Sequence, residues 1–140
     1  RIYQIGHQDF TIDWMMDNFP DLFIIFATEK TFQGIFAVND LAWVEQHIVN
    51  NHGVWGAAYP PAGMGCPGIC EGDTPSFLYL ISALRGVSQA EDPTMESWGG
   101  QFRQLPGTKH YVDAGGGITV SKWAPDFQVD FLKKLELIAE

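Results

Sequence analysis

The hydrophobic pattern at the start of the chain predicts a compact strand–helix–strand unit. Residues 1–6 (RIYQIG) are rich in Ile and Tyr, which favour a strand. A helix is expected over residues 12–18 with Thr11 as its N-cap, and it ends at Phe19 because the residue before a proline avoids the helical region. The continuous apolar run at residues 22–27 (LFIIFA) is typical of a strand that is buried on both faces of a parallel sheet.

Three more helices are predicted further along the chain. The first begins at Asn39 or Asp40, the second begins at Thr74 and stops before Gly86, and the third runs from about Pro125. Apolar residues recur at helical spacing in two of them, namely Leu41, Val44 and Ile48 in the first and Phe127, Phe131, Leu135 and Ile138 in the third.

Two segments lack such a pattern. Residues 52–73 hold six glycines and three prolines, and we expect a long functional loop there. Residues 87–124 are expected to be irregular, with several turns. The order of elements therefore predicts an α/β fold, with a partial parallel sheet flanked by helices, that forms one domain or part of one.

Composition narrows the class of protein. The chain has 140 residues, of which 46% are hydrophobic and 18% are charged, so it can bury a single core and is neither disordered nor a coiled coil. Its longest apolar run is far shorter than the roughly 20 residues of a membrane helix. The chain begins without Met on an apolar run, so we expect it to be a fragment or to have lost an N-terminal part.

The charge balance argues against nucleic acid as a partner. The net charge is −9, and residues 1–84 hold only Arg1 and Lys30 against nine acidic residues. Binding to phosphates requires Lys and Arg, so a neutral or cationic ligand or a metal ion suits this chain better. The alternative is that the acidity only confers solubility.

The two cysteines, Cys66 and Cys70, are four residues apart in the segment CPGIC. Two thiolates without a nearby His do not make a zinc site. In an oxidising compartment they would close a small disulfide loop, which we expect if the protein is secreted; in the cytosol they would remain thiols.

Polar side chains follow directly after the first predicted strand. Ligands of parallel α/β sheets bind at the carboxyl ends of the strands, and Gln8 and Asp9 lie there. Gln8 offers a donor and an acceptor, and Asp9 could bind a sugar hydroxyl or a metal ion. The alternative for Asp9 is that it only caps the following helix.

A second pair of carboxylates, Glu71 and Asp73, precedes the helix that begins at Thr74. Two residues apart in an extended segment, they would project to the same side, where they could hold a hard cation or divide acid and base roles. The alternative is that they only cap the helix and face water.

Single His and Trp residues complete the candidates. His52 is a candidate general acid or sugar contact, or otherwise an ordinary hydrogen-bonded loop residue. Trp55 and Trp98 lie beside glycines, where a flat ligand such as a sugar ring could stack on the indole. The alternative is that these tryptophans belong to the core.

At these residues the chain resembles the nucleoside-hydrolase-like domain of secreted cellulose-binding proteins. The matching stretches occur in the order of the family and span nearly the whole chain; they are IGHQDF, WMMDNFPDLFII, NHGVWGAAYP, EGDTPSFLYLI, ESWGGQF and KWAPDFQVDF. The resemblance implies that residues 1–140 form the C-terminal part of one such domain and that the protein is extracellular.

Nucleoside hydrolases cleave an N-ribosidic bond with a bound calcium ion. By resemblance, Asp73 is the later metal-ligand aspartate, and Gly72 stands where that family has its catalytic histidine. The N-terminal Asp cluster of the calcium site does not occur in these residues, so we expect calcium only when such a cluster is supplied. The sheet is then expected to be incomplete without an N-terminal segment. Its exposed edge should be covered by the N-terminal half of the domain or by another chain, which could be a second copy in a homo-oligomer.

Two functions from different classes follow. In the first, the complete domain hydrolyses a glycosidic, ribosyl-type bond of a sugar-containing small molecule, with Glu71 and His52 as catalytic groups and Asp73 on the metal. In the second, the domain is a non-catalytic cellulose- or oligosaccharide-binding or accessory module that keeps the sugar pocket. Gln8, Asp9, Trp55 and Trp98 are the predicted sugar contacts, and in the second function Trp55 and Trp98 matter more than the carboxylates. Neither function involves nucleic acid or a membrane.

Overall fold

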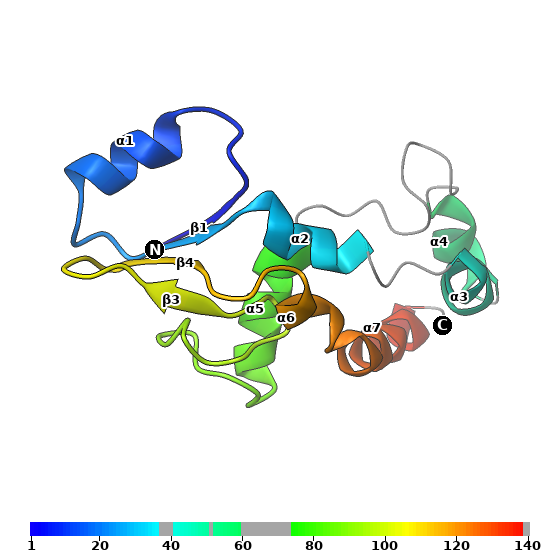
Figure 1. Cartoon of the computed structure of the whole chain (residues 1–140). Helices are drawn as coiled ribbons and strands as arrows, with labels where there is room; N and C mark the ends of the chain where they lie inside the picture. Colours follow the sequence, from blue (N-terminus) through cyan, green and yellow to red (C-terminus); the bar gives the residue numbers. More distant parts are fainter. Residues whose placement is uncertain (37–40, 51, 60–73, 139–140) are drawn as a thin grey trace.

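A four-stranded sheet lies at one end of the molecule and a group of helices at the other (Figure 1). The structure is a computed structural model that describes residues 1–36, 41–50, 52–59 and 74–138. None of the helices in these ranges is long and apolar enough to cross a membrane.

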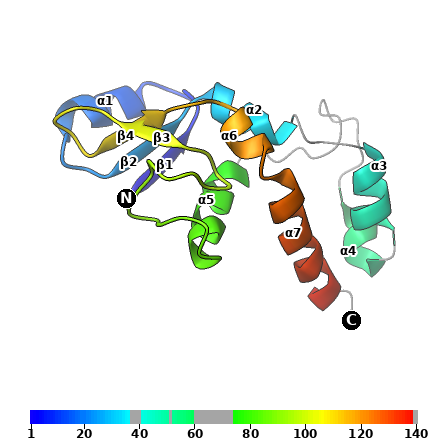
Figure 2. The same cartoon turned by 60° about the horizontal axis from the view of Figure 1, so that its bottom comes forward.

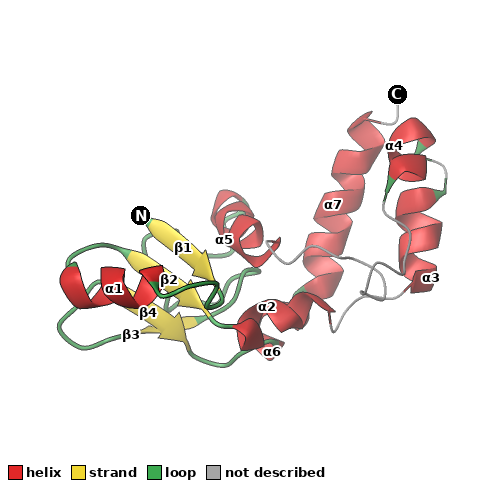
Figure 3. Cartoon of the chain, turned by 90° about the horizontal axis from the view of Figure 1, so that it is seen from above, coloured by secondary structure: helices red, strands yellow, loops and turns green. Residues whose placement is uncertain are grey.

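The sheet has the strand order β1-β2-β4-β3 and is formed by β1 (Ile2–Ile5), β2 (Ile24–Ala27), β4 (His110–Asp113) and β3 (Phe102–Gln104). β1, β2 and β4 are parallel, while β3 pairs antiparallel with β4 (Figure 3). The central strand β2 is buried along its whole length, as the run LFIIFA predicts. The α/β fold is thereby confirmed, with a mixed sheet in which β1, β2 and β4 form the predicted parallel part.

The prediction of an irregular segment at residues 87–124 was wrong, because this segment contributes β3 and β4 and the short helix α6 (Ile118–Ser121). These strands have only three and four residues, and half of β4 consists of His110 and Asp113. No apolar run marks them, and β4 joins the sheet by pairing with β2, which is distant in sequence, while in the described part of the chain β3 pairs only with β4.

Helix α1 (Thr11–Asn18) connects β1 to β2, as predicted. Its buried Ile12 packs against Ile24 and Phe26 of β2. Thr11 is not the N-cap, however: Phe10 occupies that position without a side-chain hydrogen bond. Instead, the backbone N–H of Thr11 donates to the Asp9 carboxylate at 2.8 Å, so Asp9 supplies the acceptor at the start of the helix.

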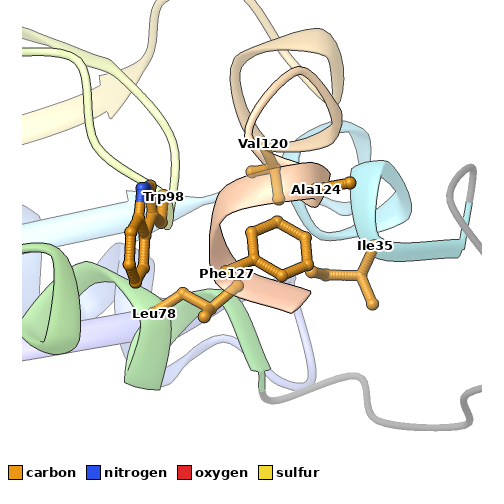
Figure 4. Close-up of a cluster of buried hydrophobic side chains, with 6 residues drawn as sticks. All are labelled: Ile35, Leu78, Trp98, Val120, Ala124 and Phe127. Atoms are coloured by element: carbon orange, nitrogen blue, oxygen red, sulfur yellow. The ribbon is translucent and has the colours of Figure 1, made fainter. Parts of the chain in front are cut away.

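The largest core cluster joins helices from distant parts of the sequence. Helix α2 (Glu29–Phe36), for which the sequence pattern had predicted no element, contributes Ile35, and α5 (Thr74–Leu84) contributes Leu78. Val120 of α6 and Phe127 of α7 (Ala124–Ile138) complete the group together with Trp98 and Ala124 (Figure 4). As predicted, α5 stops before Gly86, which adopts a φ of 72°.

A second, smaller cluster forms at the far end of the molecule. There, α3 (Leu41–Val44), a π-helix (Glu45–Val49) and α4 (Gly53–Ala58) lie beside α7 (Figure 2). Val44 and Ile48 pack against Leu135, as their spacing predicts, whereas Leu41 and Phe131 are exposed. The side chain of Ile138 and the predicted helix start at residues 39–40 lie outside the described residues. Because α4 covers residues 53–58, the predicted loop at 52–73 was wrong there.

An ion pair connects α5 to α7. The guanidinium of Arg85 donates two hydrogen bonds to the Asp130 carboxylate, at 2.6 and 3.0 Å. These bonds from Arg85 hold the pKa of Asp130 below its ordinary value. The pair fixes the end of α5 against α7 on the side where the Phe127 cluster lies.

Gly34 of α2 packs directly against the backbone of Gly117, just before α6. A Cβ atom at Gly34 would clash with the backbone carbonyl of Gly117, and a Cβ atom at Gly117 would in turn crowd Gly34. Glycine at both positions is therefore required for α2 and α6 to touch through their backbones.

Replacing Gly34 with Ala tests this contact, because the sign of the change in the free energy of unfolding depends on whether the methyl group has room. In an unhindered helix, Ala stabilises by about 1 kcal/mol relative to Gly. Here we expect Gly34→Ala to lower the free energy of unfolding by about 1–3 kcal/mol, because the methyl group forces α2 away from Gly117. Urea denaturation measures this, with the exposed neighbour Gln33→Ala as a control that should change stability by less than about 0.5 kcal/mol. A Gly34→Ala variant that is as stable as the wild type would contradict the contact.

Candidate functional site

The carboxyl ends of the three parallel strands meet at one edge of the sheet. Ile5 of β1 pairs with Ala27 of β2, and Phe26 pairs with Val112 of β4, so the three strands end at nearly the same level. Ligands of parallel α/β sheets bind at such an edge. We call the polar residues that lie here the carboxyl-edge site; they are Gln8, Asp9, Thr28, Glu29 and Asp113.

Asp113 and Thr28 join the ends of β4 and β2. The Asp113 carboxylate accepts the backbone N–H of Thr28, at 3.1 and 3.3 Å to its two oxygens, and also the Thr28 hydroxyl. The same hydroxyl oxygen accepts the backbone N–H of Lys30 at 3.3 Å. Both side chains are therefore committed to holding the edge together, and we assign them a positioning role.

Glu29 follows Thr28 and faces the segment after β1. Its Oε1 accepts the backbone N–H of His7 at 3.2 Å. Gly6, with a φ of 63°, passes so close that a Cβ atom there would lie 3.0 Å from the same oxygen. Backbone N–H groups, first its own and then that of His7, lower the pKa of Glu29, so an ionised and exposed carboxylate lies at the edge.

Gln8 and Asp9 lie at the same edge, as predicted, and both are exposed. The Gln8 amide donates to the carbonyl of Ile5 at 3.3 Å. The pKa of Asp9 is lowered, mainly by the hydrogen bond from the Thr11 backbone and then by the Thr11 hydroxyl. Asp9 thus acts at the start of α1, which was the alternative interpretation, while its exposure leaves it accessible to a ligand.

His52 and Trp55 lie elsewhere. His52 immediately precedes α4, and its Nδ1 lies 3.0 Å from the carbonyl oxygen of Asn50. Trp55 of α4 is 64% exposed. Figures 1 to 3 all show α4 at the end of the molecule opposite the sheet, so these two residues are not brought together with Gln8 and Asp9.

Trp98 is only 6% exposed and lies beside Leu78 in the largest core cluster (Figure 4). Its backbone N–H donates to the Ser82 hydroxyl at 3.1 Å. The next residue, Gly99, has no room for a Cβ atom against the backbone of α5, and its carbonyl accepts the buried Tyr3 hydroxyl at 2.8 Å. Burial raises the pKa of Tyr3 far above its ordinary value. This placement favours the core interpretation of Trp98.

The remaining predicted residues lie outside the described part of the chain. These are Glu71, Gly72 and Asp73 together with Cys66 and Cys70. Within the described ranges, no group of three or more His, Cys, Asp or Glu side chains could hold a metal ion. The described residues therefore do not fit calcium by themselves, and we derive no step through it.

Sequence reasoning missed Thr28, Glu29 and Asp113. The signal for Thr28 and Glu29 was available, because they directly follow the buried run at residues 22–27 just as Gln8 and Asp9 follow the first strand. Asp113 carried no such signal, because β4 itself was not recognised.

Residues 1–102 match the family described as "Cellulose-binding Sde182, nucleoside hydrolase-like domain". This match covers 102 of the 140 residues, from the start of the chain to the first residue of β3. The chain belongs to this family. The matched region of this chain includes Gln8, Asp9, Thr28 and Glu29 of the carboxyl-edge site, whereas Asp113 lies outside it. No curated protein and no solved structure matches the chain.

The Asp113–Thr28 contact is testable by a double-mutant cycle. We expect Asp113→Ala and Thr28→Val each to lower the free energy of unfolding by about 1–3 kcal/mol, because each leaves a polar partner unsatisfied. The coupling between them should be about 0.5–3 kcal/mol in urea denaturation. Asp21→Ala, which removes a highly exposed carboxylate, is the control and should be near neutral. Strict additivity would show that the two side chains do not interact.

The ionised state of Glu29 predicts a pH dependence. Because its pKa is lower in the folded than in the unfolded state, its contribution to stability is present above the ordinary Glu pKa of about 4.3 and is lost as the pH falls through the folded-state pKa. The free energy of unfolding of wild type minus that of Glu29→Gln, measured from pH 7 to pH 3, should therefore shrink on acidification. A difference that stays constant or grows would be the contrary result.

Proposed function

We propose that this domain binds a neutral carbohydrate at the carboxyl-edge site and that the complete domain hydrolyses a glycosidic, ribosyl-type bond. The observation that carries the proposal is the grouping of Gln8, Asp9 and Glu29 at the carboxyl ends of parallel strands in a family described as cellulose-binding. Carboxylates accept sugar hydroxyl groups, and the Gln8 amide both donates and accepts. A polysaccharide ligand also supports an extracellular location, where Cys66 and Cys70 would form a disulfide.

Hydrolysis requires one group that protonates the leaving group and another that takes the proton from the attacking water. We propose Glu71 for one of these roles, with Asp73 as a metal ligand if calcium is bound. His52, which the sequence predicts for the other role, lies at the end of the molecule opposite the carboxyl-edge site. Asp73 directly precedes α5, which packs against the core together with α2, the helix that begins at Glu29. We propose that Asp73 belongs to the same site as the carboxyl edge.

The alternative is a non-catalytic carbohydrate-binding or accessory module. By resemblance, Gly72 stands where nucleoside hydrolases have a catalytic histidine, and this favours the alternative. Sugar binding through the exposed Gln8 and Asp9 would survive without catalysis.

We further propose that the N-terminal half of the domain, or another chain such as a second copy, pairs with β1. The N–H groups of Ile2 and Gly6 donate to the β2 side of the strand, so the backbone of Tyr3 between them faces the opposite, open edge. Helix α5 also exposes Phe77, Leu80 and Leu84, which share one helical face. A free strand edge and an exposed apolar face are features that partners usually cover.

Glu71→Gln and Asp73→Asn in the full-length natural protein separate the two functions. Cleavage of a p-nitrophenyl riboside, with and without calcium, and retention on microcrystalline cellulose are the two measurements. For the enzyme, we expect each variant to lose about 100-fold or more in turnover while cellulose retention is kept. The exposed Asp126→Asn on α7 is the matched control and should change neither. Cellulose retention without riboside cleavage by the wild type would favour the module, and the absence of both would contradict the proposed function.

A further inference from the structure

Helix α1 presents an outward aromatic face, which we define as Phe10, Trp14 and Phe19. These side chains are 87%, 57% and 46% exposed. The backbone N–H of Trp14 donates to the carbonyl of Phe10 at 3.2 Å, so the two residues lie one helical turn apart on the same side. The ring of Phe19 meets the Trp14 indole edge to face, with centroids 5.4 Å apart, and supports it from beneath the end of the helix.

These aromatic side chains are not needed to dock α1 on the sheet. The opposite side of the helix does this through Ile12, Met15 and Met16, which pack with Ile24 and Phe26 of β2. Exposing three aromatic rings to water is costly, and a contiguous patch of this kind usually marks an interaction surface. We therefore treat the α1 aromatic face as an interaction surface and infer its ligand from the residues around it.

The polar residues around the face favour a neutral ligand. Asp9, Asp13, Asp17 and Asn18 are all exposed. Residues 2–29 contain five acidic residues and no Lys or Arg. Nucleic acids, anionic lipids and acidic polysaccharides would therefore be repelled. A neutral sugar chain fits both features, because the C–H faces of its pyranose rings stack on aromatic rings while its hydroxyl groups donate to carboxylates.

The exposed face of α5 differs in chemistry. It consists of Phe77, Leu80 and Leu84 and lies next to Arg85, which is paired with Asp130. A mainly aliphatic stripe of this kind matches the interior of a protein rather than a sugar. The two unpartnered faces are thus chemically distinct, and only the α1 aromatic face combines flat rings with a surplus of hydrogen-bond acceptors.

The α1 aromatic face also continues the carboxyl-edge site. Phe10 directly follows Gln8 and Asp9, so a chain bound at the edge would meet the ring of Phe10 and then that of Trp14. We propose that Phe10, Trp14 and Phe19 bind successive sugar rings of a neutral β-glucan chain that extends from the carboxyl edge. This assignment rests on the proposed carbohydrate binding and names the surface that performs it.

The test compares ring-removing and ring-keeping variants of the whole chain on microcrystalline cellulose, with cellohexaose as a soluble competitor. We expect Trp14→Ala and Phe10→Ala to lower the retained fraction at least about fivefold, whereas Trp14→Tyr keeps most of it, because stacking requires a ring. Ile118→Ala, which truncates an exposed apolar residue on α6, is the matched control and should bind like the wild type. Circular dichroism verifies that each variant is folded. If Trp14→Ala does not fold, tryptophan fluorescence on addition of cellohexaose is compared between the wild type and Trp14→Tyr. We expect a change in the wild type that Trp14→Tyr lacks, and an equal change in both would overturn the assignment.

The outcomes separate this inference from the proposed function. Wild type that binds cellulose, together with Trp14→Ala and Phe10→Ala variants that bind equally well, would overturn the assignment of the α1 aromatic face and leave carbohydrate binding in place. Wild type that binds no cellulose would overturn both. Concentration-dependent dimers in light scattering that dissociate on Trp14→Ala substitution would show that a second copy, and not a glucan, occupies the face.

Discussion

The contact between Asp113 and Thr28 holds together the part of the molecule on which the site depends. It ties the carboxyl ends of two parallel strands, β4 and β2, through backbone and side-chain hydrogen bonds to one carboxylate. Helix α2 leaves this point at Glu29, and the turn that leads to α6 leaves it after Asp113. The two helices meet again at Gly34 and Gly117, where their backbones touch. The hydrogen bonds from Thr28 to Asp113 thus determine where Glu29 lies. The packing of α2 against α6 maintains that position.

The functional surfaces follow from this arrangement. The carboxyl edge offers exposed acceptors, with the pKa values of Glu29 and Asp9 held low by backbone N–H groups, so both remain ionised at neutral pH. Next to the edge, α1 adds aromatic rings without any positive charge, which suits a neutral sugar. On the other side, β1 and α5 expose a strand edge and an aliphatic face, which suit protein. A surface that suits a neutral sugar agrees with a family described as cellulose-binding.

The sequence was informative wherever structure is local. The β1-α1-β2 unit, the buried run of β2 and the end of α5 before Gly86 all follow from patterns of a few residues. By contrast, β3 and β4 are short and partly polar; among the described strands β3 pairs only with β4, and β4 joins the sheet through β2, which is distant in sequence. Helix α2 was missed because Gly34 weakens its intrinsic preference, and only the approach of Gly117 explains that glycine. Tryptophans show the same limit, since the buried Trp98 and the exposed Trp14 are indistinguishable until tertiary packing is known.

The most direct test of a carbohydrate site organised by this edge is a backbone NMR titration of the chain with cellohexaose. We expect chemical-shift changes that concentrate at residues 7–10, at Trp14 and at residues 28–30, with α6 and α7 nearly unaffected. Changes centred on α7, with none at residues 7–10, at Trp14 or at residues 28–30, would contradict the placement of the sugar at the carboxyl ends of β1 and β2.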